Sequence, residues 1–302
     1  MNVVSIITIN YNQPKTTIEL LRSIKAFGGN NVEVILVDNA PQQNFEKEFK
    51  EAYPPLIYLY SHKNIGFAGG NNVGIKAANG DYVLLLNNDT EITEGFISAM
   101  LNEINSNNDI GLLSPLIKYF DDKEIIQYAG FTKMNYLTAR NAAIGFKEKD
   151  NEQYNHVSTE TGFCHGAAVM CRKSDIEKAG LMDERYFLYY EELDWCEKFK
   201  RTGKKIWFTG KATIYHKESM SVGKESIIKI YFMTRNRMLF IRRNTGLMNT
   251  ILFTFYFTLV AFPKQIFHYM RESKWDLIKY SFKGLLWNFT HSKNSKSLGF
   301  KI

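Results

Sequence analysis

The feature that most constrains the fold is the apolar run from Tyr82 to Leu86, which leads directly into Asn87, Asn88 and Asp89. An unbroken run of this kind is typical of a central parallel strand that is covered on both faces. In α/β proteins, ligands bind at the carboxyl ends of such strands. Asp89 is therefore a candidate for holding a metal ion or a polar ligand at that edge.

The first 120 residues alternate between strand-like and helix-like patterns. Apolar residues spaced three or four apart predict a helix over 14–27, which Gly28 and Gly29 end. This alternation predicts an α/β fold with a doubly wound, mainly parallel sheet, whose polar strand ends share one edge. We expect strands at 3–9, 32–37, 56–60 and 81–87, and further helices at 45–52, 66–78 and 96–104.

Composition fits one large domain with an appendage, since 45% of the 302 residues are hydrophobic and 23% are charged. The N-terminus reads as a strand with no basic leader, so we expect no signal or transit peptide and a cytoplasmic location. Cys164, Cys171 and Cys196 form no CxxC pair. We expect them to be small buried residues in a reducing compartment, which argues against a zinc knuckle.

Charge is uneven along the chain. Residues 217–302 carry 15 Lys and Arg against 4 Asp and Glu, a net charge of +11, whereas residues 1–216 have a net charge of −4. The uncharged segment 251–262 has twelve residues, fewer than the roughly 20 that a spanning helix needs, so we expect an interfacial or buried helix. Contact with an anionic membrane surface is favoured over nucleic acid; a solvated basic face remains an alternative.

The glycine-rich stretch 64–74 contains neither G-x-G-x-x-G nor a Walker pattern, so the dinucleotide and P-loop hypotheses lose their main support. Its glycines would let the backbone approach a ligand closely. A helix beginning there could also offer N–H groups to an anion, although a simple tight turn would need only one or two of these glycines.

Six short motifs together resemble the inverting family 2 glycosyltransferases of the GT-A fold, nearest to the rhamnosyltransferase-like bacterial branch. The resemblance is good over residues 3–243. It implies a GT-A catalytic domain over 1–216, divided into a nucleotide-sugar half (1–120) and an acceptor half (121–216), followed by a basic, aromatic, mostly helical region over 217–302. The motifs are Asn10-Tyr11-Asn12, Val37-Asp38-Asn39, Asn64-x-Gly66-Phe67-Ala68-x-Gly70-Asn71, Leu86-Asn87-Asn88-Asp89, Gly166-Ala167 and Glu191-Glu192-Leu193-Asp194.

The donor implied by this resemblance carries a diphosphate that departs with negative charge, which Mn²⁺ or Mg²⁺ neutralises. The family holds this metal with a D-x-D motif. Here Asn87 takes the first place, so Asp89 carries the charge of the motif alone. His216 matches a histidine that completes the metal site in several members, although a lone histidine is more often structural.

The resemblance also assigns the nucleotide sugar to the strand ends and to the glycine-rich stretch. Asp38 is expected to bind the base or ribose, with a turn or helix cap as the alternative. The expected nucleotide-sugar residues are Asn10, Tyr11, Asn12, Asp38, Asn39, Asn64, Gly66, Asn71, Asn87 and Asn88.

An acidic cluster at the start of a predicted helix supplies the catalytic candidates. Inversion by single displacement needs a base for the acceptor hydroxyl, and the resemblance assigns this role to Glu192. Asp194 is the alternative base, and Glu191 is expected to support the site or cap the helix. The helix dipole also favours carboxylates here whatever their function.

The acceptor is assigned to the small-residue loop His165, Gly166 and Ala167, although a plain strand start would look the same. Aromatic residues within 183–190 could stack on a sugar or belong to the core. Arg235 and Arg237 are expected to bind phosphate on the donor or on a lipid diphosphate. A Q-x-x-R-W motif is missing from the sequence, so we expect addition of a single sugar.

We therefore expect a metal-dependent glycosyltransferase at the inner face of the cell membrane. It would move one sugar from dTDP-rhamnose or a UDP-sugar to a growing, lipid-linked bacterial surface glycan. One alternative is a non-catalytic nucleotide- or sugar-binding module of a membrane-associated assembly complex. Another is a nucleic-acid-binding protein, which only the basic tail suggests.

Overall fold

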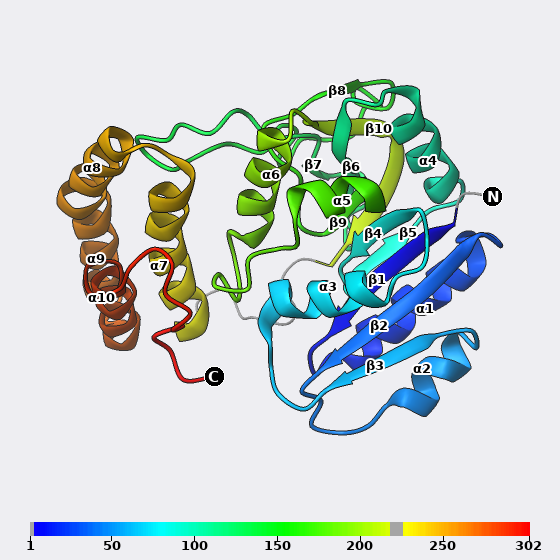
Figure 1. The fold of residues 1–302 in the computed structure, drawn as a ribbon, viewed down its shortest axis with the longest axis horizontal. Coiled ribbons are helices and arrows are strands. Elements are labelled where there is room, and N and C mark those ends of the chain that lie inside the picture. Colours follow the sequence, from blue (N-terminus) through cyan, green and yellow to red (C-terminus); the bar gives the residue numbers. More distant parts are fainter. Residues whose placement is uncertain (1–2, 218–225) are drawn as a thin grey trace.

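The computed structural model describes residues 3–217 and 226–302. A central sheet carries helices on both faces, and the C-terminal helices (residues 227–290), here called the helical layer, lie at one end of the molecule (Figure 1). The strand order is β3-β2-β1-β4-β9-β6-β10-β5, with β7 beside β6 and β8 beside β10. The strands are β1 (Val4–Asn10), β2 (Val32–Asn39), β3 (Ile57–Ser61), β4 (Tyr82–Leu86), β5 (Thr90–Ile92), β6 (Ile110–Tyr119), β7 (Ile126–Tyr128), β8 (Ser158–Glu160), β9 (Ala168–Arg172) and β10 (Lys205–His216).

The first half of the sheet is parallel. Strand β1 pairs in parallel with both β2 and β4, and β2 pairs in parallel with β3, so these strands end at one shared edge. Beyond β4 the sheet is mixed, because β9 runs antiparallel to both of its neighbours, β4 and β6. The predicted α/β fold with a mainly parallel central sheet and C-terminal helices is confirmed.

Helices follow the strands as expected in the first half. The predicted bounds of the first four helices differ from the observed ones by two residues or fewer. The helices are α1 (Pro14–Phe27), α2 (Glu46–Ala52), α3 (Gly66–Ala77), α4 (Phe96–Ser106), α5 (Lys173–Ala179), α6 (Glu191–Arg201), α7 (Ile227–Asn244), α8 (Leu247–Tyr256), the π-turn η1 (Phe257–Ala261), α9 (Phe262–Arg271) and α10 (Trp275–Thr290).

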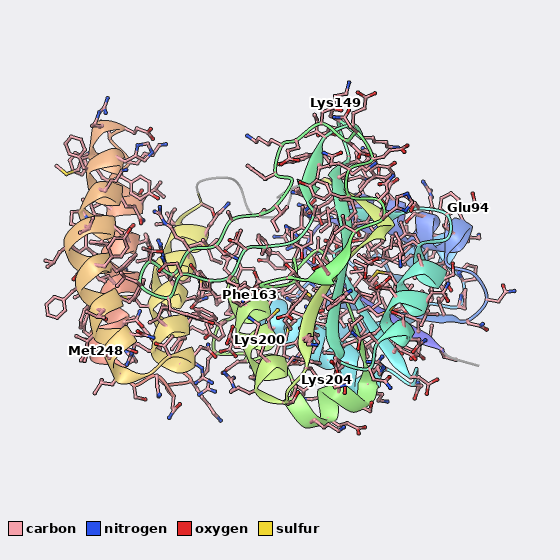
Figure 2. All side chains as sticks on the ribbon, turned by 90° about the horizontal axis from the view of Figure 1, so that it is seen from above. Glu94, Lys149, Phe163, Lys200, Lys204 and Met248 are labelled. Carbon is pink, nitrogen blue, oxygen red and sulfur yellow. The ribbon has the colours of Figure 1, made fainter. Side chains whose placement is uncertain are left out.

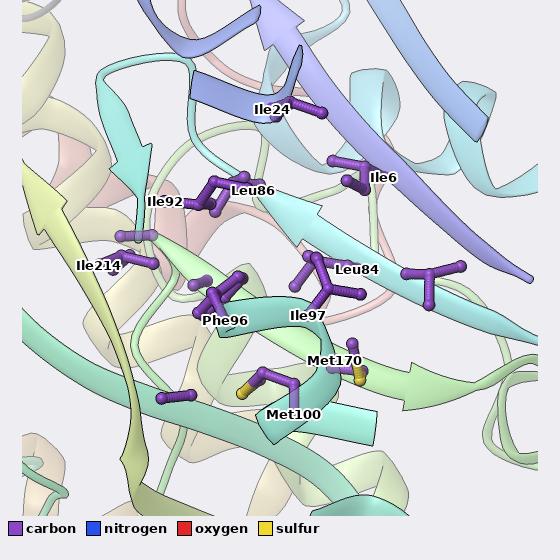
Figure 3. Packing of buried hydrophobic residues seen from close by; sticks show 14 of the residues in the cluster. Ile6, Ile24, Leu84, Leu86, Ile92, Phe96, Ile97, Met100, Met170 and Ile214 are labelled. Carbon is purple, nitrogen blue, oxygen red and sulfur yellow. The ribbon is translucent and has the colours of Figure 1, made fainter. Parts of the chain in front are cut away.

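Two apolar layers fix the sheet, because successive side chains of a strand point to opposite faces. Ile6 and Leu84 pack with α1 and α4 on one face, where Phe96 and Met100 project from α4 toward the strands (Figure 3). The next residues along the same strands, such as Ile7, pack with α3, α5 and α6 on the other face. Burying each such aliphatic side chain contributes about 1.5–3 kcal/mol.

The helical layer contains one long, apolar helix. Helices α8 and α9 join through η1 into a single helix, Leu247–Arg271, of 25 residues. By length and composition it could cross a membrane, and only 17% of its most apolar stretch is buried. The twelve-residue segment 251–262 is thus only part of a longer helix, so its length no longer argues against a membrane span. The helix continues past Pro263, next to the π-turn that adjusts the local hydrogen bonding.

The three cysteines are free thiols in the core, as expected. Residues 218–225, which belong to the predicted C-terminal region, lie outside the described residues.

Candidate active site

A pocket of about 310 Å³, here called the donor-side pocket, lies at the carboxyl ends of β1, β2 and β4 beside the start of α3. Most of the residues predicted to bind the nucleotide sugar reach it. Amide side chains dominate its polar lining, and amides can both donate and accept hydrogen bonds. The predicted residues that line it are Tyr11, Asn39, Asn64, Gly66, Asn71, Asn87, Asn88 and Asp89.

Three predicted residues do not line this pocket. Asp38 is completely buried, and its carboxylate accepts hydrogen bonds from Asn10 Nδ2 (2.8 Å) and from the Tyr58 hydroxyl (2.7 Å). Burial raises the pKa of Asp38 against the opposing effect of these two hydrogen bonds. Asn12 accepts instead from the N–H of Gln42 (3.0 Å). Asp38 therefore ties β1, β2 and β3 together beneath the pocket, and its contact with the base or ribose stays a prediction.

The start of α3 is also not an open anion site. Three consecutive N–H groups are already engaged: Ile65 donates to Asn39 Oδ1 (3.0 Å), Gly66 to Asn64 Oδ1 (2.9 Å), and Phe67 to the Phe187 carbonyl (2.7 Å). These three N–H groups hold the surrounding loops and are not free to bind a phosphate.

A second pocket of about 520 Å³, the acceptor-side pocket, adjoins the first. Both are lined by Phe67, Asn87, Asp89 and Leu188, so Asp89 stands at their junction. Predicted acceptor, base and metal residues meet here from the loop before β9, the start of α6 and the end of β10. They are His165, Gly166, Ala167, Glu191, Glu192 and His216.

Asp89 and His216 form a buried pair. His216 Nε2 lies 3.2 Å from Asp89 Oδ1, and His216 Nδ1 lies 2.8 Å from Gln127 Oε1. Burial alone would raise the pKa of Asp89, but the neighbouring His216 outweighs this effect and lowers it.

The pair fits a divalent cation. His216 Nδ1 lies within hydrogen-bond distance of Gln127 Oε1, and a ring that donates from Nδ1 to this oxygen could offer Nε2 to a cation held beside Asp89. Asp89 Oδ1 is buried and has no hydrogen-bond donor. A shared cation would stabilise this arrangement, although the described residues contain no group of three or more His, Cys, Asp and Glu side chains suited to a metal. The chain therefore offers two ligands here.

The acidic side chains at the start of α6 point in two directions: Glu191 and Glu192 line the acceptor-side pocket, and Asp194 does not. Glu191 is 3% exposed, and burial together with the charge of Glu192 raises its pKa well above the usual value. Glu192 is half-buried, and burial also raises its pKa. A Cβ placed on Gly166 would lie 3.8 Å from Glu192 Cγ, so the acid borders the small-residue loop.

Asp194 faces away from both pockets. It accepts hydrogen bonds from the Tyr186 hydroxyl (3.0 Å) in the preceding loop and from Asn244 Nδ2 (2.8 Å) at the end of α7. Its candidacy as the base therefore has no geometric support, because a base must reach the acceptor hydroxyl.

Arg235 and Arg237 line neither pocket, contrary to their predicted role in phosphate binding. Arg235 is completely buried, donates to the Arg185 carbonyl (2.9 Å) and lies 4.0 Å from the Trp287 ring centre. Arg237 donates to the Thr138 carbonyl (2.6 Å). A cation that does line the acceptor-side pocket is Lys229.

His165, one of the predicted acceptor residues, has a strongly lowered pKa. Burial, followed by the nearby His216, lowers its pKa to about 3, so its ring is neutral near pH 7. Its Nδ1 accepts from the Ala167 N–H (3.1 Å), and the ring stacks on Phe131.

Sequence reasoning did not find Gln127, Leu188 and Lys229 as site residues. Gln127 lies in the three-residue strand β7, and the other two belong to no motif. Only their three-dimensional position identifies them.

Comparison with known proteins gives the family. The sequence model of glycosyl transferase family 2 matches residues 5–178, more than half of the chain. The chain belongs to this family. A hexosyltransferase of low-salt glycan biosynthesis, Agl10 from Haloferax volcanii, is 26% identical over 78% of this chain and 74% of its own length.

Two rhamnosyltransferases are also similar. The N-acetylglucosaminyl-diphospho-decaprenol L-rhamnosyltransferase of Mycobacterium tuberculosis is 23% identical over 74% of this chain and 79% of its own. The dTDP-rhamnosyl transferase RfbF of Shigella flexneri is 22% identical over 71% and 72%. The predicted resemblance to rhamnosyltransferase-like members of family 2, and with it the prediction of a glycosyltransferase, is confirmed.

Solved structures agree in fold. GalNAc-T7 with UDP, GalNAc and Mn²⁺ has a TM-score of 0.61 at 13% identity, covering 78% of this chain but only 49% of that longer protein. The mannosyltransferase PcManGT from Pyrobaculum calidifontis, in complex with GDP-Man and Mn²⁺, has a TM-score of 0.58 at 12% identity, covering 95% and 87%. At these identities the likeness concerns the fold alone.

Proposed function

We propose that this family 2 glycosyltransferase moves one hexosyl group from a nucleotide-diphospho-sugar to a lipid-linked bacterial surface glycan, with inversion at the anomeric carbon. The observation that carries the proposal is Asp89 at the junction of two pockets, with Glu192 on the wall of the second. The donor nucleotide would occupy the donor-side pocket, and its diphosphate would reach Asp89. A dTDP-rhamnose donor is supported by the names of the rhamnosyltransferase relatives, and a UDP-sugar is the alternative.

Glu192 is the proposed base. It would take the proton of the acceptor hydroxyl as the new bond to the anomeric carbon forms and the bond to the diphosphate oxygen breaks. Burial raises the pKa of Glu192, which strengthens its basicity, and burial together with the charge of Glu192 raises the pKa of the neighbouring Glu191. His165 would present an uncharged ring to the acceptor.

The residues that would hold Mn²⁺ or Mg²⁺ are Asp89 and His216, with Gln127 fixing the orientation of the histidine. When bound, the cation supplies positive charge that stabilises the departing diphosphate. Lys229 is positioned to add a further positive charge on the acceptor side.

A thermal-shift screen of dTDP-, UDP- and GDP-sugars, with and without Mn²⁺, tests the donor and the metal together, because a bound ligand raises the melting temperature. Transfer to a polyprenyl-diphosphate glycan acceptor tests the reaction. Donor binding without turnover by the wild-type protein would favour the non-catalytic binding module and overturn the proposed reaction.

We also propose that the helical layer rests on the inner face of the cell membrane. The outward face of helix Leu247–Arg271 is strongly apolar: Leu247, Phe255 and Leu259 are 77%, 62% and 70% exposed. Met248 lies at the outer side of this layer, far from the sheet (Figure 2). The net charge of +11 over 217–302 favours anionic lipid.

An orientation in the plane of the membrane is supported by contacts that bind the helix to α10. The Phe262 ring lies 5.0 Å from Phe282, and Gln265 donates to Ser281 (3.2 Å). Sedimentation with phosphatidylglycerol vesicles should weaken in a Phe255→Asp, Leu259→Asp variant. The control is Phe27→Asp on α1, where another exposed aromatic residue is replaced. Equal sedimentation of both variants would contradict membrane contact through this face.

A further inference from the structure

The loop that leads into α6, residues 183–190, has an unusual backbone. Phe187, Tyr189 and Tyr190 have φ values of +64°, +67° and +74°. Bulky side chains rarely adopt this left-handed region, which costs of the order of 1–3 kcal/mol for each residue. Such a conformation persists only when surrounding contacts hold it.

Asn236 of α7 supplies those contacts. Its side chain is completely buried, and Nδ2 lies 2.8–2.9 Å from the carbonyl oxygens of Tyr186, Leu188 and Tyr189. The preceding residue, Arg235, donates to the Arg185 carbonyl (2.9 Å) and to Asn236 Oδ1 (2.6 Å). Two neighbouring side chains of α7 therefore hold the main chain of this loop.

The same loop joins the two pockets to the acids. The Phe187 carbonyl accepts the N–H of Phe67 at the start of α3. Leu188 lines both pockets, while Tyr189 and Tyr190 line the acceptor side. Tyr190 is also the residue that precedes Glu191 and Glu192 at the start of α6.

We propose that Asn236 is a positioning residue, which sets the left-handed loop and through it the placement of Glu192 relative to the donor. The proposal rests on the proposed function, in which Glu192 is the base. Asn236 lines neither pocket, so it acts only through the loop.

The test compares Asn236→Ala with Asn288→Ala. Asn288 is also a buried asparagine, 5% exposed, whose Nδ2 donates to the carbonyls of Arg235 (2.9 Å) and Gly284 (3.2 Å), away from the loop. We expect similar losses of melting temperature in both variants. Only Asn236→Ala should lower kcat of the folded enzyme by tenfold or more, with a smaller change in donor KM. Asn236→Asp, which keeps the volume but loses the donor group, should show the same loss.

Hydrogen exchange provides a readout that does not depend on turnover. Amides of 186–193 should exchange faster in Asn236→Ala than in Asn288→Ala or the wild type. Unchanged loop protection, or an equal fall of kcat in both alanine variants, would overturn the positioning role. If the wild-type protein transfers no sugar, the proposed reaction fails, and the exchange result still decides whether Asn236 holds the loop.

Discussion

The two pockets differ in how the chain builds them. The donor-side pocket is lined mainly by residues within 9–89, which lie at the ends of adjacent parallel strands and at the start of α3. The acceptor-side pocket gathers side chains from the loop before β9, the start of α6, the end of β10 and α7. A nucleotide site can thus follow from local strand-helix units, whereas the acceptor site depends on long-range packing. Asp89 and Leu188 line both pockets and therefore lie at their boundary.

Replacing Glu192 by Gln should have the largest effect on kcat. It should also distinguish the role of the acceptor-side pocket from that of the donor-side pocket. Loss of a general base lowers kcat by about 10²–10⁴-fold. Nucleotide-sugar binding should not change, because Glu192 lines only the acceptor side. Steady-state kinetics and donor thermal shifts measure the two quantities. Glu197→Gln is the matched control, since Glu197 lies on the same helix but binds Tyr136 and Lys200. Equal weakening of donor binding by Glu192→Gln would remove the distinction between the pockets.

Replacing Asp89 by Asn should affect both sides, because this carboxylate lies at their junction. Loss of one charge-stabilising group lowers kcat by about 10²–10³-fold. The extra thermal stabilisation that Mn²⁺ gives to the donor complex should also disappear. Asp81→Asn is the control, since Asp81 is an exposed residue just before the opposite end of β4. A variant that keeps the Mn²⁺ effect would exclude Asp89 as a ligand.

The same contrast explains what the sequence could predict. The polar residues that follow predicted strands correctly placed Asn39, Asn87 and Asp89 at one edge of the sheet. The different placement of Asp38 follows from the strand period of two: adjacent side chains point to opposite faces, so Asn39 lines the pocket and Asp38 is buried. A motif match alone gave both residues the same role.

On the acceptor side the errors come from helix geometry. Glu191 and Glu192 face the pocket, whereas Asp194, two or three positions further on the 3.6-residue turn, faces α7. Arg235 and Arg237 have the composition of a phosphate site but turn into the protein core, which depends on how α7 packs. Gln127 lies beside His216 because β7, which carries it, pairs with β6. No local pattern contains that information.

Gly66→Ala tests the physical link between the pockets. Gly66 has φ +73°, and an added Cβ would lie 2.3 Å from the Phe187 carbonyl oxygen. Gly29 has nearly the same φ, +74°, but nothing lies within 4 Å of an added Cβ. Both substitutions should lower stability by about 1–2 kcal/mol through backbone strain.

Only Gly66→Ala should also displace the 183–190 loop and raise donor KM. A perturbation of about 1.4 kcal/mol corresponds to roughly a tenfold change in affinity. Chemical denaturation and steady-state kinetics measure the two effects. Identical kinetics for the two variants would show that the contact between Gly66 and Phe187 does not couple the pockets.

The last difference between the two sides is how their carboxyl groups titrate. The pKa of Asp89 is lowered in the folded protein, so its contribution to stability is lost as the pH falls through that value. Glu191 behaves oppositely: burial and the charge of Glu192 raise its pKa well above 4.5, so the folded protein holds a proton that the unfolded chain releases. Between the pKa of Glu191 in the unfolded chain and its higher pKa in the folded protein, the free energy of unfolding falls by about 1.4 kcal/mol for each pH unit of increase.

Glu191→Gln should remove this loss, because glutamine is neutral at every pH. Its melting temperature should therefore exceed that of the wild type by a margin that widens from pH 4.5 upward. Glu94→Gln, at an exposed position two residues after β5, should follow the wild-type curve. Calorimetric scans from pH 4 to pH 8 make the comparison. If Glu191→Gln and the wild type lose stability in parallel, Glu191 is already ionised in the folded protein. The acceptor side would then carry two charges beside the acceptor hydroxyl, and Glu192 would no longer be distinguished from its neighbour by charge.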